Sequence, residues 1–136
     1  MDIRKLVCVF LLGASTASFA SNTYWFTMTD LPPGAHIAII HGDPHKQGEF
    51  VAQLKFPGNY IVPAHHHATE AKATVISGTY YIGEGTVADG NTGRPISTGK
   101  SFIIPANNKH YGFTKEETIL QIEAMGPWNM IYSKNG

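Results

Sequence analysis

The sequence predicts an all-β fold arranged as a single barrel. Three observations indicate it: the segments after Ala20 are short and either apolar or alternating, turn-forming residues separate them, and no run keeps a helical period for three turns. Many short strands joined by regular turns are typical of a sandwich or a barrel. A barrel is favoured because alternate residues of its strands point inward, which allows histidines from distant segments to meet inside it.

Nine segments have the length and composition of strands. They are Ala35–His41, Glu49–Phe56, Tyr60–His67, Ala71–Ser77, Thr79–Gly83, Lys100–Ile104, Tyr111–Phe113, Thr118–Ala124 and Trp128–Tyr132. The connections between them are rich in Gly, Pro, Asn and Asp, which preset or tolerate turn dihedrals. The longest connection, Gly83 to Gly99, is expected to be irregular and to run over the surface.

Residues 1–20 have the features of a secretory signal peptide. A short positive start is followed by an apolar stretch, Leu6 to Leu12, and by small residues that end at Ala20. The apolar stretch is well below the roughly 20 residues needed to span a bilayer. We therefore expect export, cleavage after Ala20, a mature domain at 21–136 and no membrane association after cleavage.

The composition of the mature chain limits its partners and its chemistry. Removing residues 1–20 from the 136 leaves 116, which is enough for one hydrophobic core and too few for two. Basic and acidic residues are nearly balanced, which argues against a nucleic-acid partner. The only cysteine, Cys8, lies within the signal, so the mature protein is expected to have neither disulfides nor thiol catalysis.

Two histidine segments are the main candidates for a functional site. His65 and His67 are two residues apart on a predicted strand, so both side chains point to one face, while His66 points to the other. His110 comes from a later strand. Neutral imidazole suits zinc, copper, iron and nickel better than magnesium or calcium. The alternative for the His-x-His pair is a solvent-exposed polar face.

These segments resemble the two sequence motifs of the cupin superfamily. Gly58 to Gly78, which contains His65 and His67, is similar to the first motif, and Gly99 to Pro105 followed by His110 is similar to the second. Both motifs stand in the expected order and separation, and the resemblance to short single-domain bacterial cupins covers nearly all of the mature chain. Together with the signal, it favours a bacterial periplasm or secretion as the location.

The resemblance implies a jelly-roll (double-stranded β-helix) barrel. It also implies one divalent transition metal ion, namely Fe, Zn, Ni, Mn or Cu, held by His65, His67 and His110. Cupins usually add a glutamate ligand, but Ala71 stands at that position. Glu70 can replace this ligand only if a bulge follows His67.

Two functional interpretations follow from the missing carboxylate. Three neutral imidazoles leave open coordination positions, as a dioxygenase-like oxidoreductase or a hydrolase of a small organic substrate requires. Alternatively, the weaker site binds a small molecule without chemistry, or sequesters metal. A third, purely structural role would be self-association through sheet edges, and a homodimer of this kind is compatible with either function.

Further candidates depend on which face of a strand is buried. Gln121 and Glu123 share a face; if it is inward, Gln121 lines the pocket and Glu123 serves as a general base, a substitute ligand or a partner that orients an imidazole. The alternative is a solvated outer row beside a core of Ile119, Leu120 and Ile122. Tyr60 and Phe102 are candidate pocket residues because aromatic side chains commonly wall small-molecule sites.

Overall fold

The computed structural model describes residues 23–134. The predicted signal peptide, residues 1–20, lies outside them, so the described residues belong to the predicted domain at 21–136. No helix in this part of the chain is long and apolar enough to cross a membrane.

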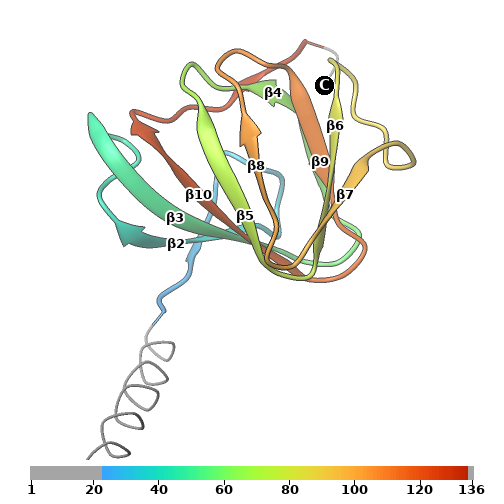
Figure 1. Ribbon diagram of the computed structural model, residues 1–136, viewed down its shortest axis with the longest axis horizontal. Coiled ribbons are helices and arrows are strands. Elements are labelled where there is room, and N and C mark those ends of the chain that lie inside the picture. The colour runs from blue at the N-terminus through green and yellow to red at the C-terminus, as the bar shows by residue number, and fades with distance from the viewer. Residues whose placement is uncertain (1–22, 135–136) are drawn as a thin grey trace, which may run out of the picture.

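Two antiparallel sheets face one another and enclose the core (Figure 1). The strands are β1 (Phe26–Thr27), β2 (His36–His41), β3 (Gly48–Phe56), β4 (Ile61–His66), β5 (Ala71–Ser77), β6 (Thr79–Glu84), β7 (Arg94–Ser97), β8 (Ser101–Ile104), β9 (His110–Phe113), β10 (Thr118–Gly126) and β11 (Ile131–Tyr132). One sheet has the order β1-β2-β3-β10-β5-β8 and the other β11-β4-β9-β6-β7. The predicted all-β jelly-roll fold is confirmed.

Alternation of side chains along the long central strands builds the core. Every second residue is buried from Phe50 to Phe56 in β3 and from Thr118 to Ile122 in β10, and the cross-strand partners Leu54 and Leu120 both point inward. Stacked rings fill the space between the sheets, with Phe56 centred 5.3 Å from Tyr60 and 5.9 Å from Tyr80. The two sheets are therefore held together mainly by apolar and aromatic contacts.

A bulge in β4 sets the direction of the histidines. The pairing of β4 with β9 shifts between Val62 and His65, so both of these residues face inward although they are three apart. Pro63 lies in the bulge, where no hydrogen bond between the strands requires a backbone N–H, so its lack of one costs nothing. Simple alternation from Val62 would have turned His65 outward, so the bulge is what brings the His-x-His pair into the barrel.

Two strands were missed, and one predicted strand is much shorter in the structure. β1 and β7 were not predicted, because β1 has only two residues and β7 lies within the stretch from Gly83 to Gly99 that was expected to be irregular. The predicted strand Trp128–Tyr132 shrinks to its last two residues, since Trp128 turns into the core instead of joining a sheet.

Candidate metal centre

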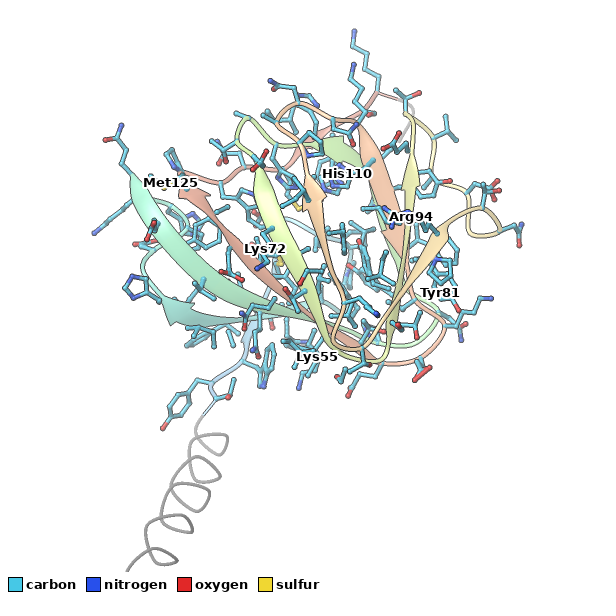
Figure 2. All side chains as sticks on the ribbon, viewed as in Figure 1. Lys55, Lys72, Tyr81, Arg94, His110 and Met125 are labelled. Carbon is cyan, nitrogen blue, oxygen red and sulfur yellow. The ribbon has the colours of Figure 1, made fainter. Side chains whose placement is uncertain are left out.

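Three histidines on the inner face of the five-stranded sheet form a cluster, hereafter the His triad: His65, His67 and His110. His65 on β4 is the cross-strand partner of His110 on β9, and His67 follows the end of β4. All three side chains are at most 3% exposed, and their nearest ligand atoms lie within 4.8 Å of one another. The predicted convergence of these histidines is confirmed. Figure 2 places His110 near the end of the barrel at which β9 begins.

Backbone carbonyls fix the protonation of all three rings. The Nδ1 atom of His65 lies 2.6 Å from the carbonyl oxygen of Pro63. The corresponding distances are 2.9 Å from His67 to Asn129 and 2.8 Å from His110 to Asn108. A carbonyl oxygen can only accept a hydrogen bond, so each Nδ1 carries the proton and donates. Each Nε2 of the neutral rings therefore presents an unprotonated lone pair.

The Nε2 lone pairs of His65 and His67 face each other. Nε2 of His65 lies 3.1 Å from Nε2 of His67. With both nitrogens unprotonated, this contact is not a hydrogen bond, and a metal cation bound between the two would relieve the repulsion. Two nitrogens about 2.1 Å from one ion are about 3.0 Å apart at a right angle and about 3.4 Å apart at the tetrahedral angle. The observed spacing fits a shared metal ion with nitrogen ligands.

Burial keeps the imidazoles neutral. Desolvation, together with the nearby His110, lowers the pKa of His65 to about 3. Desolvation lowers the pKa of His67 to about 4 and also lowers the pKa of His110. Neutral rings are the form that binds metal, so no proton has to leave the His triad at neutral pH.

Trp128 closes the site on one side and was not among the site residues predicted from the sequence. Its indole stacks on the His67 ring, with centroids 4.4 Å apart and planes 13° from parallel. The cavity beside the His triad has a volume of about 20 Å³ and is otherwise walled by aliphatic and aromatic side chains. A space of roughly 10–15 Å³ holds one water molecule, so this cavity has room for about one water and for no organic molecule.

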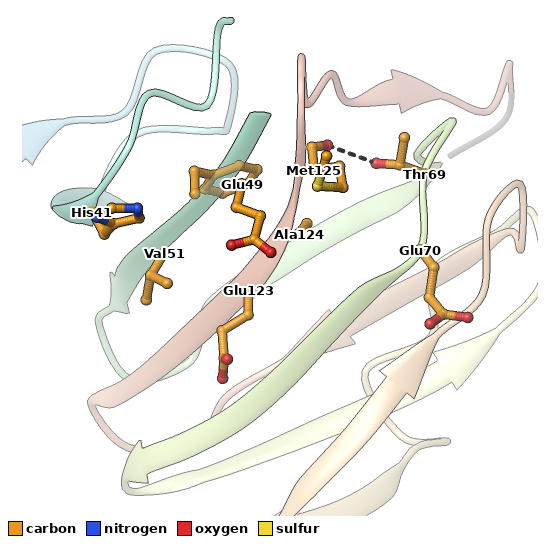
Figure 3. Close-up of a pocket in the computed structure, with 9 residues that line it drawn as sticks. His41, Glu49, Val51, Thr69, Glu70, Glu123, Ala124 and Met125 are labelled. Carbon is orange, nitrogen blue, oxygen red and sulfur yellow. Dashed lines mark hydrogen bonds between the residues drawn. The ribbon is translucent and has the colours of Figure 1, made fainter. Parts of the chain in front are cut away.

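The structure corrects three predicted site residues, which lie outside the barrel. Glu70 and Glu123 line a groove of about 540 Å³ on the outer face of the six-stranded sheet (Figure 3). Glu70 is exposed, because alternation turns the buried Ala71 inward instead. Gln121 accepts a hydrogen bond of 3.0 Å from Gln53 on the same outer face. None of the three reaches the His triad, so Glu70 is no substitute ligand, Glu123 is no general base there and Gln121 lines no pocket with it.

The two aromatic pocket candidates are also wrong for the cavity at the His triad. Tyr60 is buried in the core, where it stacks on Phe56 and donates a hydrogen bond to the Pro32 carbonyl. Phe102 is buried on β8 and lines a separate cleft at the side of the barrel. Neither side chain lines the cavity at the His triad.

The carboxylate associated most directly with the His triad is Glu84, which the sequence did not single out. Glu84 at the end of β6 is the cross-strand partner of His110, and its charge opposes the lowering of the His110 pKa by burial. Partners in antiparallel strands point to the same face. Only the register between β6 and β9 reveals this neighbour, because the two residues are far apart in the sequence.

Comparison with known proteins finds similarity in structure only. No protein-family model and no curated protein matches the chain. An RmlC-like cupin from Shewanella frigidimarina is 18% identical with a TM-score of 0.62, over 79% of this chain and 87% of that one. An acetylacetone dioxygenase from Acinetobacter johnsonii is 16% identical with a TM-score of 0.63, over 86% and 76%. A DMSP lyase from Ruegeria pomeroyi is 13% identical with a TM-score of 0.64, over 84% and 64%.

Proposed function

We propose that this chain, which has the cupin fold, holds one divalent transition metal ion on its His triad and uses it to transform a small organic substrate, as a dioxygenase-like oxidoreductase or a hydrolase. The observation that carries the proposal is the convergence of the three buried imidazoles of the His triad, with the Nε2 atoms of His65 and His67 only 3.1 Å apart. The resemblance to structures named as a dioxygenase and a lyase supports a catalytic use of such a site.

The metal ion and the residues around it would have different roles in such a site. When bound, the metal would supply Lewis acidity and, if it is redox-active, electron transfer. Three protein ligands leave coordination positions free for water or substrate. The carbonyls of Pro63, Asn108 and Asn129 hold the rings in the ligating tautomer. Trp128 covers His67 and keeps bulk water from that side of the site.

A second function, metal or ligand binding without turnover, is favoured by the size of the cavity. A space of about 20 Å³ admits a metal ion or a water molecule, but it admits no organic substrate unless a neighbouring side chain moves. Substrate-dependent consumption of oxygen or release of product by the metal-loaded protein would support the enzyme. Tight retention of metal with no turnover across a broad set of substrates would support the alternative.

The experiment that tests the proposal is elemental analysis of residues 21–136, purified without a His tag. We expect close to one equivalent of a transition metal after reconstitution and none in a His65→Ala/His110→Ala variant. A His36→Ala/His41→Ala variant is the matched control, because it removes two histidines from β2, outside the His triad. Equal and negligible metal in all three proteins would contradict the proposed function.

We further propose that the protein acts outside the cytoplasm, after removal of residues 1–20. The proposal depends on the charge and apolar pattern of that segment. Mass spectrometry of the full-length product from a bacterial periplasmic fraction should give a chain that begins at Ser21. A full-length chain retained in the cytoplasm would contradict it.

A further inference from the structure

We propose that the cleft between the free edges of the two sheets, hereafter the side cleft, binds a small zwitterion beside the metal centre. β7 ends the five-stranded sheet and β8 ends the six-stranded sheet, and no strand pairing joins them. The side cleft between them has a volume of about 240 Å³. It is lined by Ile82, Glu84, Arg94, Phe102, Ile103, Ile104, Pro105 and Asn108. The proposal extends the proposed function, because it assigns a ligand class to the metal site.

Both charged residues of the side cleft lie on the inner face of their sheet. Tyr80 and Ile96 are buried cross-strand partners, so they mark the inner face of β6 and β7. Arg94 is two residues from Ile96 and therefore points to the same face. Glu84 points to that face as well, because its partner on β9 is His110. A cation and an anion therefore line one small cleft, and both side chains are exposed, so a ligand in the cleft can reach them.

The charges define the ligand. A guanidinium binds a carboxylate through paired, charge-assisted hydrogen bonds, and a carboxylate binds an ammonium group or another donor. Arg94 and Glu84 both line the side cleft, so one ligand can contact the two charged groups. A ligand with only a carboxylate would face Glu84 unfavourably, whereas a molecule with both charges satisfies the two side chains. The apolar walls at Ile82 and Phe102 suit a short carbon chain between the charges.

The side cleft and the cavity at the His triad share a lining residue. Ile104 lines both the side cleft and the cavity beside the three histidines. Asn108, which lines the side cleft, also supplies the carbonyl that holds His110. The cavity itself is too small for an organic molecule, so the side cleft provides the space that a substrate needs.

Binding is tested on the metal-free protein by amide NMR titration with three matched probes. β-Alanine carries both charges, propionate only the carboxylate and propylamine only the ammonium group. We expect β-alanine to shift the amides of Ile82, Arg94 and Asn108, with at least tenfold weaker binding of the other two probes. Arg94→Ala and Glu84→Gln should each weaken β-alanine binding about tenfold or more. Lys72→Ala is the matched control, since Lys72 is exposed on the outer face of β5.

Each result decides the proposal. If no probe shifts the side-cleft amides, or if propionate binds as well as β-alanine, the assignment of a zwitterion site is overturned. Binding that survives in the His65→Ala/His110→Ala variant is expected, because the side cleft needs no metal. In cobalt-loaded protein, β-alanine protons should relax faster than in the zinc-loaded form. Unchanged relaxation in a protein that demonstrably holds cobalt would overturn the link to the metal while leaving the metal site intact.

Discussion

Acidification is expected to destabilise the metal-free protein through the buried histidines. In the unfolded chain a histidine titrates near 6.5, whereas the folded protein lowers the pKa of His65 to about 3 and of His67 to about 4. Their contribution to the free energy of unfolding is fully present above pH 6.5, where the rings are neutral in both states. It is lost as the pH falls toward 4 and 3, because only the unfolded chain takes up the protons. When the pH falls from about 7.5 to 5.5, each of the two rings should lower the free energy of unfolding by roughly 1.4 kcal/mol, so the pair should lower it by about 3 kcal/mol.

The assay is urea denaturation in the presence of a chelator, followed by tryptophan fluorescence at both pH values. A His65→Gln/His67→Gln variant should lose most of the pH dependence. A His36→Gln/His41→Gln variant should keep it, because these residues lie on β2, outside the His triad. Free energies of unfolding that agree at the two pH values for the unaltered protein would refute the reasoning that the rings are buried and neutral.

Three further predictions concern the metal, the Trp128 stack on His67 and a glycine of β9. Zinc should raise the melting temperature of the protein in a concentration-dependent way, with no rise in His65→Ala; a rise that persists in this variant would place the metal elsewhere. Trp128→Ala should destabilise the protein by about 3–5 kcal/mol and weaken metal retention, whereas Trp128→Phe, which keeps a ring over His67, should do less; equal melting temperatures would contradict a structural stack. Gly112→Ala should destabilise by about 1–3 kcal/mol or more, because its methyl group would overlap the buried Tyr80 phenol; urea denaturation with an unchanged midpoint would contradict this packing.

The sequence was sufficient for the fold class and for the His triad, but less so for the local geometry. Histidine spacing and the cupin resemblance predicted which three rings meet. Their direction, however, depends on the bulge between Val62 and His65, and a bulge leaves little trace in a sequence beyond the proline. β7 escaped prediction because four residues that include Pro95 lie among glycines.

The remaining errors come from strands whose two faces are both apolar or whose partners are distant. β10 carries Ile119 on one face and Leu120 and Ile122 on the other, so its pattern could not decide whether Glu123 was inside. Burial of Leu120 and Ile122 in the structure decides against it. Glu84 and Arg94 had no recognisable pattern, because their common face follows from the strand register and not from their spacing.

The carbonyl groups that hold the three imidazoles have a consequence for sequence variation. They belong to Pro63, Asn108 and Asn129, and every amino acid carries a carbonyl oxygen. Replacement of these side chains therefore removes no acceptor, provided that the main chain keeps its path. A redesign of the surroundings, or genetic drift in them, can alter charge and shape next to the histidines while the readiness of the rings to bind metal is retained.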